Sequence, residues 1–152
     1  MNILFFELFE KVDAAKTKLE KIKLLQQFDS QPLRGLLRIN FDPNLKMNLP
    51  EGEPPFKKDL DKPIGYDETN LLTEFRRFYI WFDQNLNLSK LKREQLFVDL
   101  LEGLNFREAE MLCLVKDKKL TSRFKTLKED IVREAFPELL PPKESKTTKE
   151  NV

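Results

Sequence analysis

The 152-residue sequence predicts an all-α fold, with one compact domain of about seven helices. Three observations support this fold class. Apolar residues recur at spacings of three and four, the period of a helix that packs one face against a core. Only four glycines occur, whereas an all-β domain of this size would need more of them in tight turns. Thirteen phenylalanines and a hydrophobic fraction of 40% are enough for one core.

The first three helices are indicated by apolar spacing and by capping residues. We expect the first over residues 2–15, where phenylalanine and leucine widen an apolar stripe. Thr17 with Glu20 three residues later forms a capping box for the second helix. Asp29 or Ser30 is expected to cap the third.

A proline-rich stretch, residues 42–66, follows the third helix. It holds five prolines, beginning with Pro43, and two glycines, so we expect no regular secondary structure there. We predict an ordered loop that wraps over the core and is held by Leu49 and Phe56. A loop of this length inside a compact domain is often functional.

An aromatic segment after this loop predicts a long helix that begins at Asp67 or Thr69. Its apolar side chains again recur at three and four: Leu71, Leu72, Phe75, Phe78, Tyr79 and Phe82. We expect one core to unite part of this segment with later helices, through Phe75, Phe78, Phe82, Phe97, Leu100 and Val132.

The remaining helices are marked by further capping residues. Ser89 and Asn105 are expected to cap the next two helices. Thr126 with Glu129 resembles a capping box for the last helix. Backbone N–H groups at the start of that helix would then point toward the residues just before it.

The helical domain is expected to span residues 1–140, and the apolar-poor tail over residues 141–152 is expected to be disordered. Glu7 and Glu10 interrupt the apolar start of the chain, so we predict neither a signal peptide nor a membrane span. A single cysteine, Cys113, fits a reducing compartment, and we expect a cytoplasmic protein.

The residue types present argue against catalysis. Histidine is absent from the sequence, which removes the commonest general base and metal ligand. One cysteine cannot form a thiolate zinc site, and we expect Cys113 to be a buried structural thiol. No phosphate-binding glycine loop or dinucleotide fingerprint occurs. We therefore predict a protein that is not an enzyme and takes no cofactor, metal or small-molecule substrate.

One local charge asymmetry stands out in a chain whose net charge is only +1. Only Asp117 opposes a cluster of six basic residues: Lys116, Lys118, Lys119, Arg123, Lys125 and Lys128. Together with the N-terminus of the last helix, these side chains could contact DNA phosphates. The alternative interpretation is a solvated turn.

Three segments carry a resemblance to a known group of proteins: residues 40–43 (NFDP), 49–56 (LPEGEPPF) and 112–120 (LCLVKDKKL). On these motifs, residues 3–140 resemble an uncharacterised family of small proteins from large contractile-tailed phages, many of which infect marine cyanobacteria. The resemblance implies residence in the cytoplasm of an infected host cell and implies no particular function.

The order of elements is also similar to the helical N-terminal DNA-binding domain of ATP-dependent DNA ligases. The similar parts are residues 17–25, 33–43 and 102–141, the last with a Lys116-Asp117 helix end and a Phe136-Pro137 stop. This resemblance implies a grip on duplex DNA through phosphates, here by the basic cluster. The adenylated lysine of the ligase core is absent, so no ligase activity is implied.

These observations lead to two functional hypotheses. The first is a non-enzymatic phage accessory protein that binds duplex DNA through phosphate contacts, without sequence specificity. The alternative is an adaptor or inhibitor that binds a phage or host protein through the Pro50–Pro63 loop and nearby aromatic residues.

Overall fold

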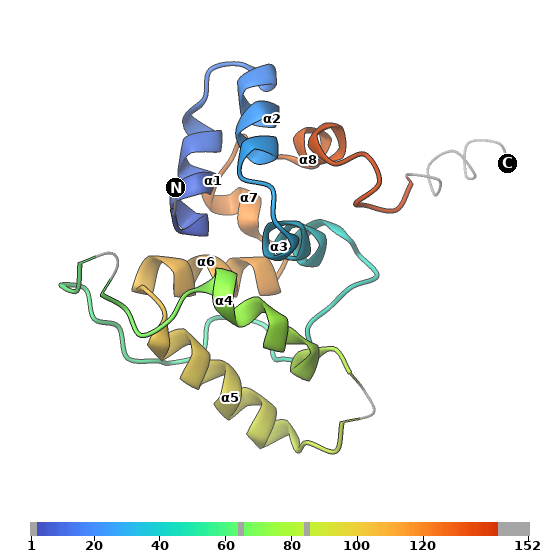
Figure 1. The fold of residues 1–152 in the computed structure, drawn as a ribbon. Helices are drawn as coiled ribbons and strands as arrows, with labels where there is room; N and C mark the ends of the chain where they lie inside the picture. The colour runs from blue at the N-terminus through green and yellow to red at the C-terminus, as the bar shows by residue number, and fades with distance from the viewer. Residues whose placement is uncertain (1–2, 64–65, 84–85, 143–152) are drawn as a thin grey trace, which may run out of the picture.

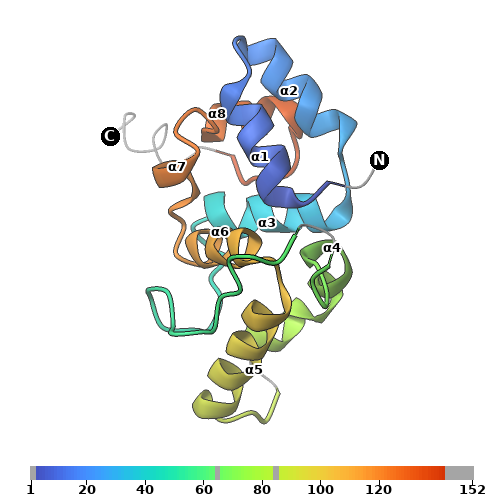
Figure 2. The same cartoon turned by 90° about the vertical axis from the view of Figure 1, so that its left-hand side faces the viewer.

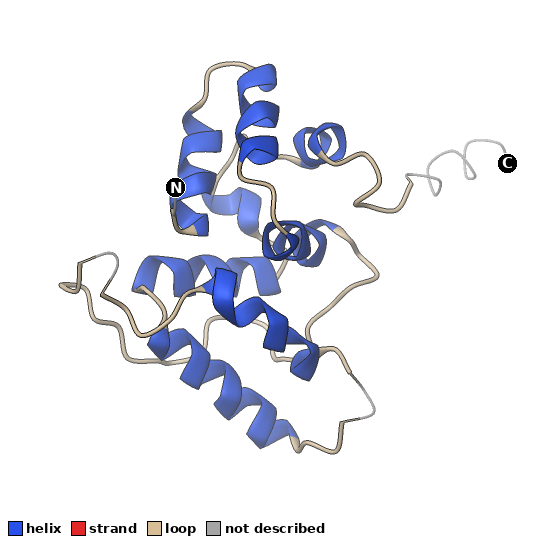
Figure 3. Cartoon of the chain, viewed as in Figure 1, coloured by secondary structure: helices blue, strands red, loops and turns tan. Residues whose placement is uncertain are grey.

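The computed structural model describes residues 3–63, 66–83 and 86–142, and all regular elements within these ranges are helical (Figure 1, Figure 3). The described residues form eight α-helices and one 3-10 helix: α1 (Phe5–Ala14), α2 (Lys18–Gln27), α3 (Gln31–Phe41), α4 (Leu71–Glu74), η1 (Phe75–Trp81), α5 (Lys90–Gly103), α6 (Phe106–Lys116), α7 (Leu120–Arg123) and α8 (Glu129–Ala135). The predicted all-α fold is confirmed. There are more helices than the seven expected because α4 and α7 are single turns of four residues.

Helix α6 lies in the middle of the fold, between two groups of elements. In Figure 1, α1, α2 and α8 lie above it and α5 lies below it, and Figure 2 shows the same order from the side. Helix α3 packs on α6 and also contacts α4 and η1. Buried apolar residues from these elements join in one core cluster.

Four of the predicted helix caps are present. The Thr17 hydroxyl accepts a hydrogen bond from the Glu20 N–H at 3.1 Å, which satisfies one of the free donors at the start of α2. Helices α3, α5 and α6 begin in the same way, with Ser30, Ser89 and Asn105 as the capping side chains. Helix α3 ends at Phe41, before Pro43, as expected.

The aromatic segment begins later than predicted. Neither Asp67 nor Thr69 starts it, because the Asn70 side chain takes the capping position and accepts a hydrogen bond from the Thr73 N–H at 2.9 Å. The α-helical part is the single turn α4, and the chain then continues as a 3-10 helix. The prediction of one long α-helix is therefore wrong.

The 3-10 geometry of η1 has a physical reason in its sequence. Three residues per turn place residues i, i+3 and i+6 on one side of the helix. Phe75, Phe78 and Trp81 have this spacing, and their rings contact one another in series, tilted at 4.9 Å and edge-on at 5.3 Å between centroids. The Trp81 ring then meets Phe97 of α5 edge-on at 5.6 Å. The tighter helix thus places three aromatic side chains in one row, which runs from Phe75 against Gly35 of α3 to Trp81 against Phe97 of α5.

The predicted shared core is confirmed. Phe78, Phe97 and Val132 are buried, and the other three expected members are partly buried and pack against the same cluster: Phe75, Phe82 and Leu100. Cys113 is also buried, as expected. Burial raises the pKa of its thiol to about 12.

The last helix does not begin as predicted. Helix α8 starts at Glu129, and its capping residue, Lys128, makes no side-chain capping bond. Thr126 faces a different partner: its N–H donates to Asp13 Oδ1 at 2.8 Å, and its hydroxyl bonds with the same carboxylate at 2.6 Å. A tertiary hydrogen bond to the end of α1 has displaced the local capping box.

A buried carboxylate, Glu108, joins two helix starts in the interior. Its two oxygens accept hydrogen bonds from the N–H groups of Phe5 and Leu71, each at 3.1 Å, at the first residues of α1 and α4. Negative charge is favoured at helix N-termini. Burial has the larger effect, however, and raises the pKa of Glu108 to about 7.

The predicted disordered tail falls mostly on residues 143–152, which lie outside the described residues. Among the described helices, none combines the length and the apolar character that a membrane-spanning segment requires.

Candidate binding groove between the proline-rich loop and helix α5

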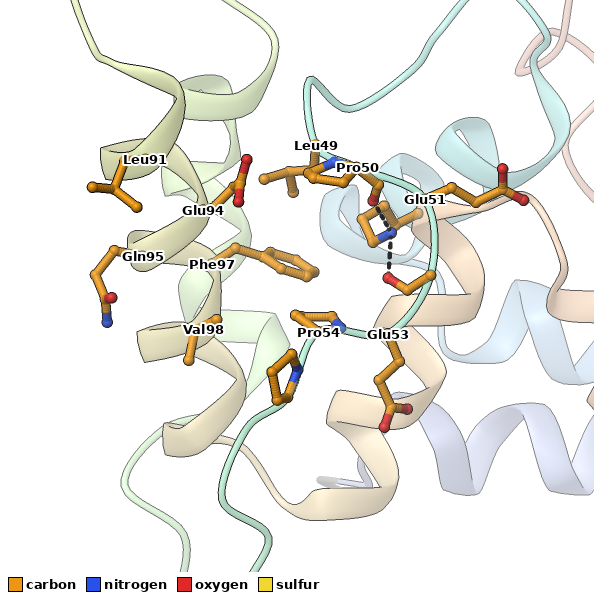
Figure 4. Close-up of a pocket in the computed structure, with 13 residues that line it drawn as sticks. Leu49, Pro50, Glu51, Glu53, Pro54, Leu91, Glu94, Gln95, Phe97 and Val98 are labelled. Atoms are coloured by element: carbon orange, nitrogen blue, oxygen red, sulfur yellow. Dashed lines mark hydrogen bonds between the residues drawn. The ribbon is translucent and has the colours of Figure 1, made fainter.

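The proline-rich loop follows the predicted course. Its described part, residues 42–63, contains turns and bends but neither helix nor strand. Leu49 and Phe56 are partly buried and pack against the core, as expected. The loop passes beside α6 and α5 (Figure 1, Figure 4).

Lys116, at the end of α6, holds this loop through hydrogen bonds to its backbone. The side chain is 3% exposed, and its ammonium donates hydrogen bonds to the carbonyl oxygens of Pro50 at 2.7 Å and Gly52 at 3.0 Å (dashed lines in Figure 4). It also pairs with Asp117 Oδ1 at 2.7 Å. The second oxygen of Asp117 accepts the Gly52 N–H at 3.0 Å. The buried Lys116–Asp117 pair therefore bonds with both the carbonyl and the N–H of Gly52.

The conformation at this point requires glycine. Gly52 has a φ of +96°, in a region that side chains with a Cβ rarely adopt. The loop turns there, which brings the carbonyls on either side of residue 51 toward the same ammonium.

Lys58 and Lys57 attach the following part of the loop. The Lys58 ammonium pairs with Glu110 of α6 at 2.8 Å and with Glu53 of the loop itself at 2.9 Å. The Lys57 N–H donates to Glu102 of α5 at 2.9 Å. The loop is thus tied to two different helices along its length, and its conformation is set before any ligand arrives.

Between this loop and α5 lies an open groove of about 270 Å³ (Figure 4). Its lining is mainly apolar, with Phe97 as the most buried member, and the apolar lining residues are Leu49, Pro50, Pro54, Pro55, Leu91, Phe97 and Val98. Small-ligand and peptide sites share this character, in which apolar walls carry a few polar groups.

Leu91 and Glu94 give the α5 side of the groove its chemistry. Leu91 is 77% exposed, the highest value among the exposed large apolar residues of the described chain. Glu94 follows it by three residues, so both side chains lie on one helix face. Within the described residues, Glu94 has no ion-pair or side-chain hydrogen-bond partner.

The charges that line the groove are unequal. Three carboxylates line it, on Glu51, Glu53 and Glu94, against one cation. That cation is Lys116, whose ammonium is already bound by three oxygens. The groove therefore presents apolar surface with three carboxylates at its rim, of which Glu53 is paired with Lys58 and Glu51 with Lys119.

Two of the six residues of the basic cluster bond with the backbone of other segments. Lys116 is buried as described above, and Lys118 is partly buried near the end of α3. The Lys118 ammonium donates to the carbonyls of Ile39, Asp42 and Leu45 at 2.5, 2.7 and 2.5 Å. Burial lowers its pKa. These two lysines therefore act as anchors between segments, with their ammonium groups bound to backbone carbonyls.

The other four cations reach the surface but differ in their partners. Lys119 pairs with Glu51 at 3.1 Å, and Arg123 lies 3.7 Å from Glu110 and 3.9 Å from Glu10. Lys125 and Lys128 are exposed, and neither side chain bonds with a residue that the structure describes. The six predicted contact residues thus do not form one free basic surface.

Sequence reasoning missed Leu91 and Glu94. Leu91 lies outside the apolar stripe of α5 that faces the core at Phe97 and Leu101. An apolar residue off the stripe was the available signal, but single exposed leucines are common on protein surfaces. Leu91 can be recognised as a groove residue only when the structure places the loop opposite α5.

No group of three or more side chains suited to hold a metal ion occurs among the described residues. The fold and the geometry of the groove define an all-helical protein with an open, pre-formed apolar groove.

By sequence, the chain belongs to DUF6433, a family of unknown function whose model matches residues 8–122. The matched region contains the whole groove, including Lys116. No curated protein and no solved structure matches the chain significantly. The phage origin and the likeness to the ligase domain remain predictions from the sequence.

Proposed function

We propose that this protein is a non-enzymatic binding protein that holds a short segment of a protein partner in the groove between the proline-rich loop and α5. The observation that carries the proposal is Leu91, an exposed leucine at the edge of a pre-formed apolar groove. The segment that fits would carry an apolar side chain to cover Leu91 and a basic residue to meet Glu94.

The energetics favour such a segment. Covering a leucine side chain fully contributes roughly 1.5–3 kcal/mol, and the partner's own apolar side chain contributes a similar amount. Binding to a mobile loop would lose part of this gain through ordering of the loop. Here Lys116, Asp117 and Lys58 already hold the loop in place.

Charge favours a basic residue in the partner. Glu94 has no cationic partner among the residues that the structure describes, and the Glu51–Lys119 pair is exposed on both sides. Exposed pairs contribute little to stability, so Glu51 can exchange its partner at small cost. A lysine or arginine of the bound segment would therefore meet two available carboxylates.

Duplex DNA, the first hypothesis from the sequence, receives less support. Binding would have to proceed without Lys116 and Lys118, whose ammonium groups are bound to backbone carbonyls. Lys119 and Arg123 would first have to leave their carboxylates. Lys125 and Lys128 remain, and two contacts provide only weak duplex binding.

The test compares peptide binding by two leucine variants. A random peptide display library would be selected on the wild-type protein alone. Leu19→Glu is the matched control, because Leu19 is 60% exposed on α2, away from the groove. Affinities of the selected peptides would be measured by fluorescence anisotropy.

We expect peptides with an apolar and a basic residue that bind Leu91→Glu about tenfold or more weakly than Leu19→Glu. Equal binding to both variants would overturn the proposal. A labelled duplex provides the comparison: binding at 50 mM salt that is lost in Lys125→Glu/Lys128→Glu would restore DNA as the leading partner.

A further inference from the structure

A second groove lies between α3 and the aromatic segment, and it shares no lining residue with the first. This α3–η1 groove has a volume of about 590 Å³. One wall comes from α3 and the other from α4 and η1, which lie side by side in Figure 1. Nothing in the proposed function uses it.

Close packing of the two walls shapes its floor. A Cβ on residue 35 would lie 1.9 Å from the Phe75 ring, so only glycine lets this ring approach α3. The Phe75 ring also packs on Phe78 at 4.9 Å. The floor is therefore aromatic and fixed in position.

Tyr79 provides an aromatic ring that faces solvent at this groove. It is 58% exposed. Phe82, which also lines the groove, is partly buried, and Leu72 is exposed. An exposed ring beside apolar neighbours offers a surface on which a planar group can stack.

The groove is also positively charged. Of the described residues that line it, Arg38 and Arg76 alone are charged. Neither guanidinium pairs with a residue that the structure describes. Two other arginines nearby in the sequence behave differently: Arg34 pairs with Asp29 at 2.6 Å, and Arg77 pairs with Glu74 at 3.3 Å. The two unpaired arginines are the ones that line the groove.

We propose that the α3–η1 groove binds single-stranded nucleic acid, with a base stacked on Tyr79 and phosphates at Arg38 and Arg76. Arginine is suited to this role because its planar fork bonds phosphate oxygens in pairs and also stacks on rings. Within a duplex the bases stay stacked on one another, so only its terminal pairs offer a base face to Tyr79. An acidic peptide would satisfy the arginines but would leave the ring without a planar partner.

The experiment uses fluorescein-labelled dT10 and measures anisotropy at several salt concentrations. We expect weak binding whose log affinity falls against log salt with a slope of about −1.4, since each of two phosphate contacts contributes about −0.7 for a single strand. Arg38→Ala and Arg76→Ala should each flatten this slope by about half. Arg77→Ala is the matched control, because Arg77 is adjacent in sequence but does not line the groove.

Stacking is tested separately with two tyrosine variants. Tyr79→Ala should weaken dT10 binding about tenfold. Tyr66→Ala, which removes a ring that is 73% exposed elsewhere, should leave it unchanged. A 5-iodouracil oligonucleotide should cross-link to Tyr79 in the wild-type protein, and mass spectrometry would locate the cross-linked residue.

Three results would overturn the proposal: no dT10 binding at micromolar protein, a labelled duplex bound as tightly as dT10, or displacement of dT10 by an acidic peptide at lower concentration than by unlabelled dT10. Leu91→Glu should leave dT10 binding unchanged, so this site and the first groove can be tested independently.

Discussion

Replacement of Lys116 by methionine would remove the ammonium that fastens the proline-rich loop. Methionine keeps most of the side-chain length and apolar volume, so packing around α6 changes little. The variant leaves the carbonyls of Pro50 and Gly52 without their donor and Asp117 without its cation. The charge that remains lies in a largely buried position, because the Asp117 side chain is only 10% exposed.

The size of the effect follows from that burial. Removal of one partner of a buried ion pair costs about 3–5 kcal/mol, since the other charge stays buried without compensation. Against a total stability of roughly 5–15 kcal/mol for a domain, this is a large loss. The second change Asp117→Asn should recover about 1 kcal/mol or more, because it removes the uncompensated carboxylate.

Urea denaturation followed by circular dichroism would measure these free energies of unfolding. Lys119→Met is the matched control, because its pair with Glu51 is exposed and should contribute less than about 1 kcal/mol. Hydrogen exchange at the Gly52 amide should also accelerate in Lys116→Met. A loss below about 1 kcal/mol with unchanged exchange would refute the view that Lys116 holds the loop.

Four further predictions concern the core, the buried acid, the thiol and the second lysine anchor. Phe78→Ala should lower the free energy of unfolding by about 3–5 kcal/mol, the usual range for an emptied aromatic site; a loss near zero in urea denaturation would contradict its burial. Burial raises the pKa of Glu108 from 4.5 to about 7, so the folded protein binds one more proton than the unfolded chain between these values. The contribution of Glu108 to stability should therefore fall as pH rises across this interval, by about 3 kcal/mol at most, and the difference between wild-type and Glu108→Gln denaturation curves should show it. Cys113 should react with iodoacetamide only after denaturation, because its raised pKa makes the thiolate about a thousandfold scarcer than in the unfolded chain; rapid labelling of the native protein would contradict this. Lys118→Glu should lower the melting temperature by several degrees, whereas Lys119→Glu should leave it nearly unchanged, and calorimetry that shows equal effects would argue against Lys118 as an anchor.

Features that depend on neighbouring residues could be predicted from the sequence. The caps at Thr17, Ser30, Ser89 and Asn105 bond with N–H groups two or three residues ahead, so the residue type and its position are sufficient. The same holds for the end of α3 before Pro43 and for the aromatic core members. Apolar spacing reports burial reliably when each helix covers one side of a single core.

Tertiary contacts decided how α8 begins and which type of helix the aromatic segment forms. Thr126 and Glu129 match a local capping pattern, yet Asp13 lies close enough to take the Thr126 N–H and hydroxyl. The aromatic segment has apolar residues at both α-helical and 3-10 spacings. Its contacts with α3 and α5 selected the tighter helix, because Phe75 fits against Gly35 and Trp81 against Phe97.

The sequence by itself determined the all-α class, most helix caps, the proline-rich loop and the presence of six cations near residue 120. Only the tertiary structure decided what those cations do. Lys116 and Lys118 bond with backbone carbonyls 64–79 residues away along the chain, and no local pattern reveals such partners. Arg38 and Arg76, far apart in sequence, instead line one groove without a carboxylate. The sequence gives the number and position of the charged side chains. Whether such a side chain is free to bind a ligand depends on which oxygens the folded backbone brings within hydrogen-bonding distance.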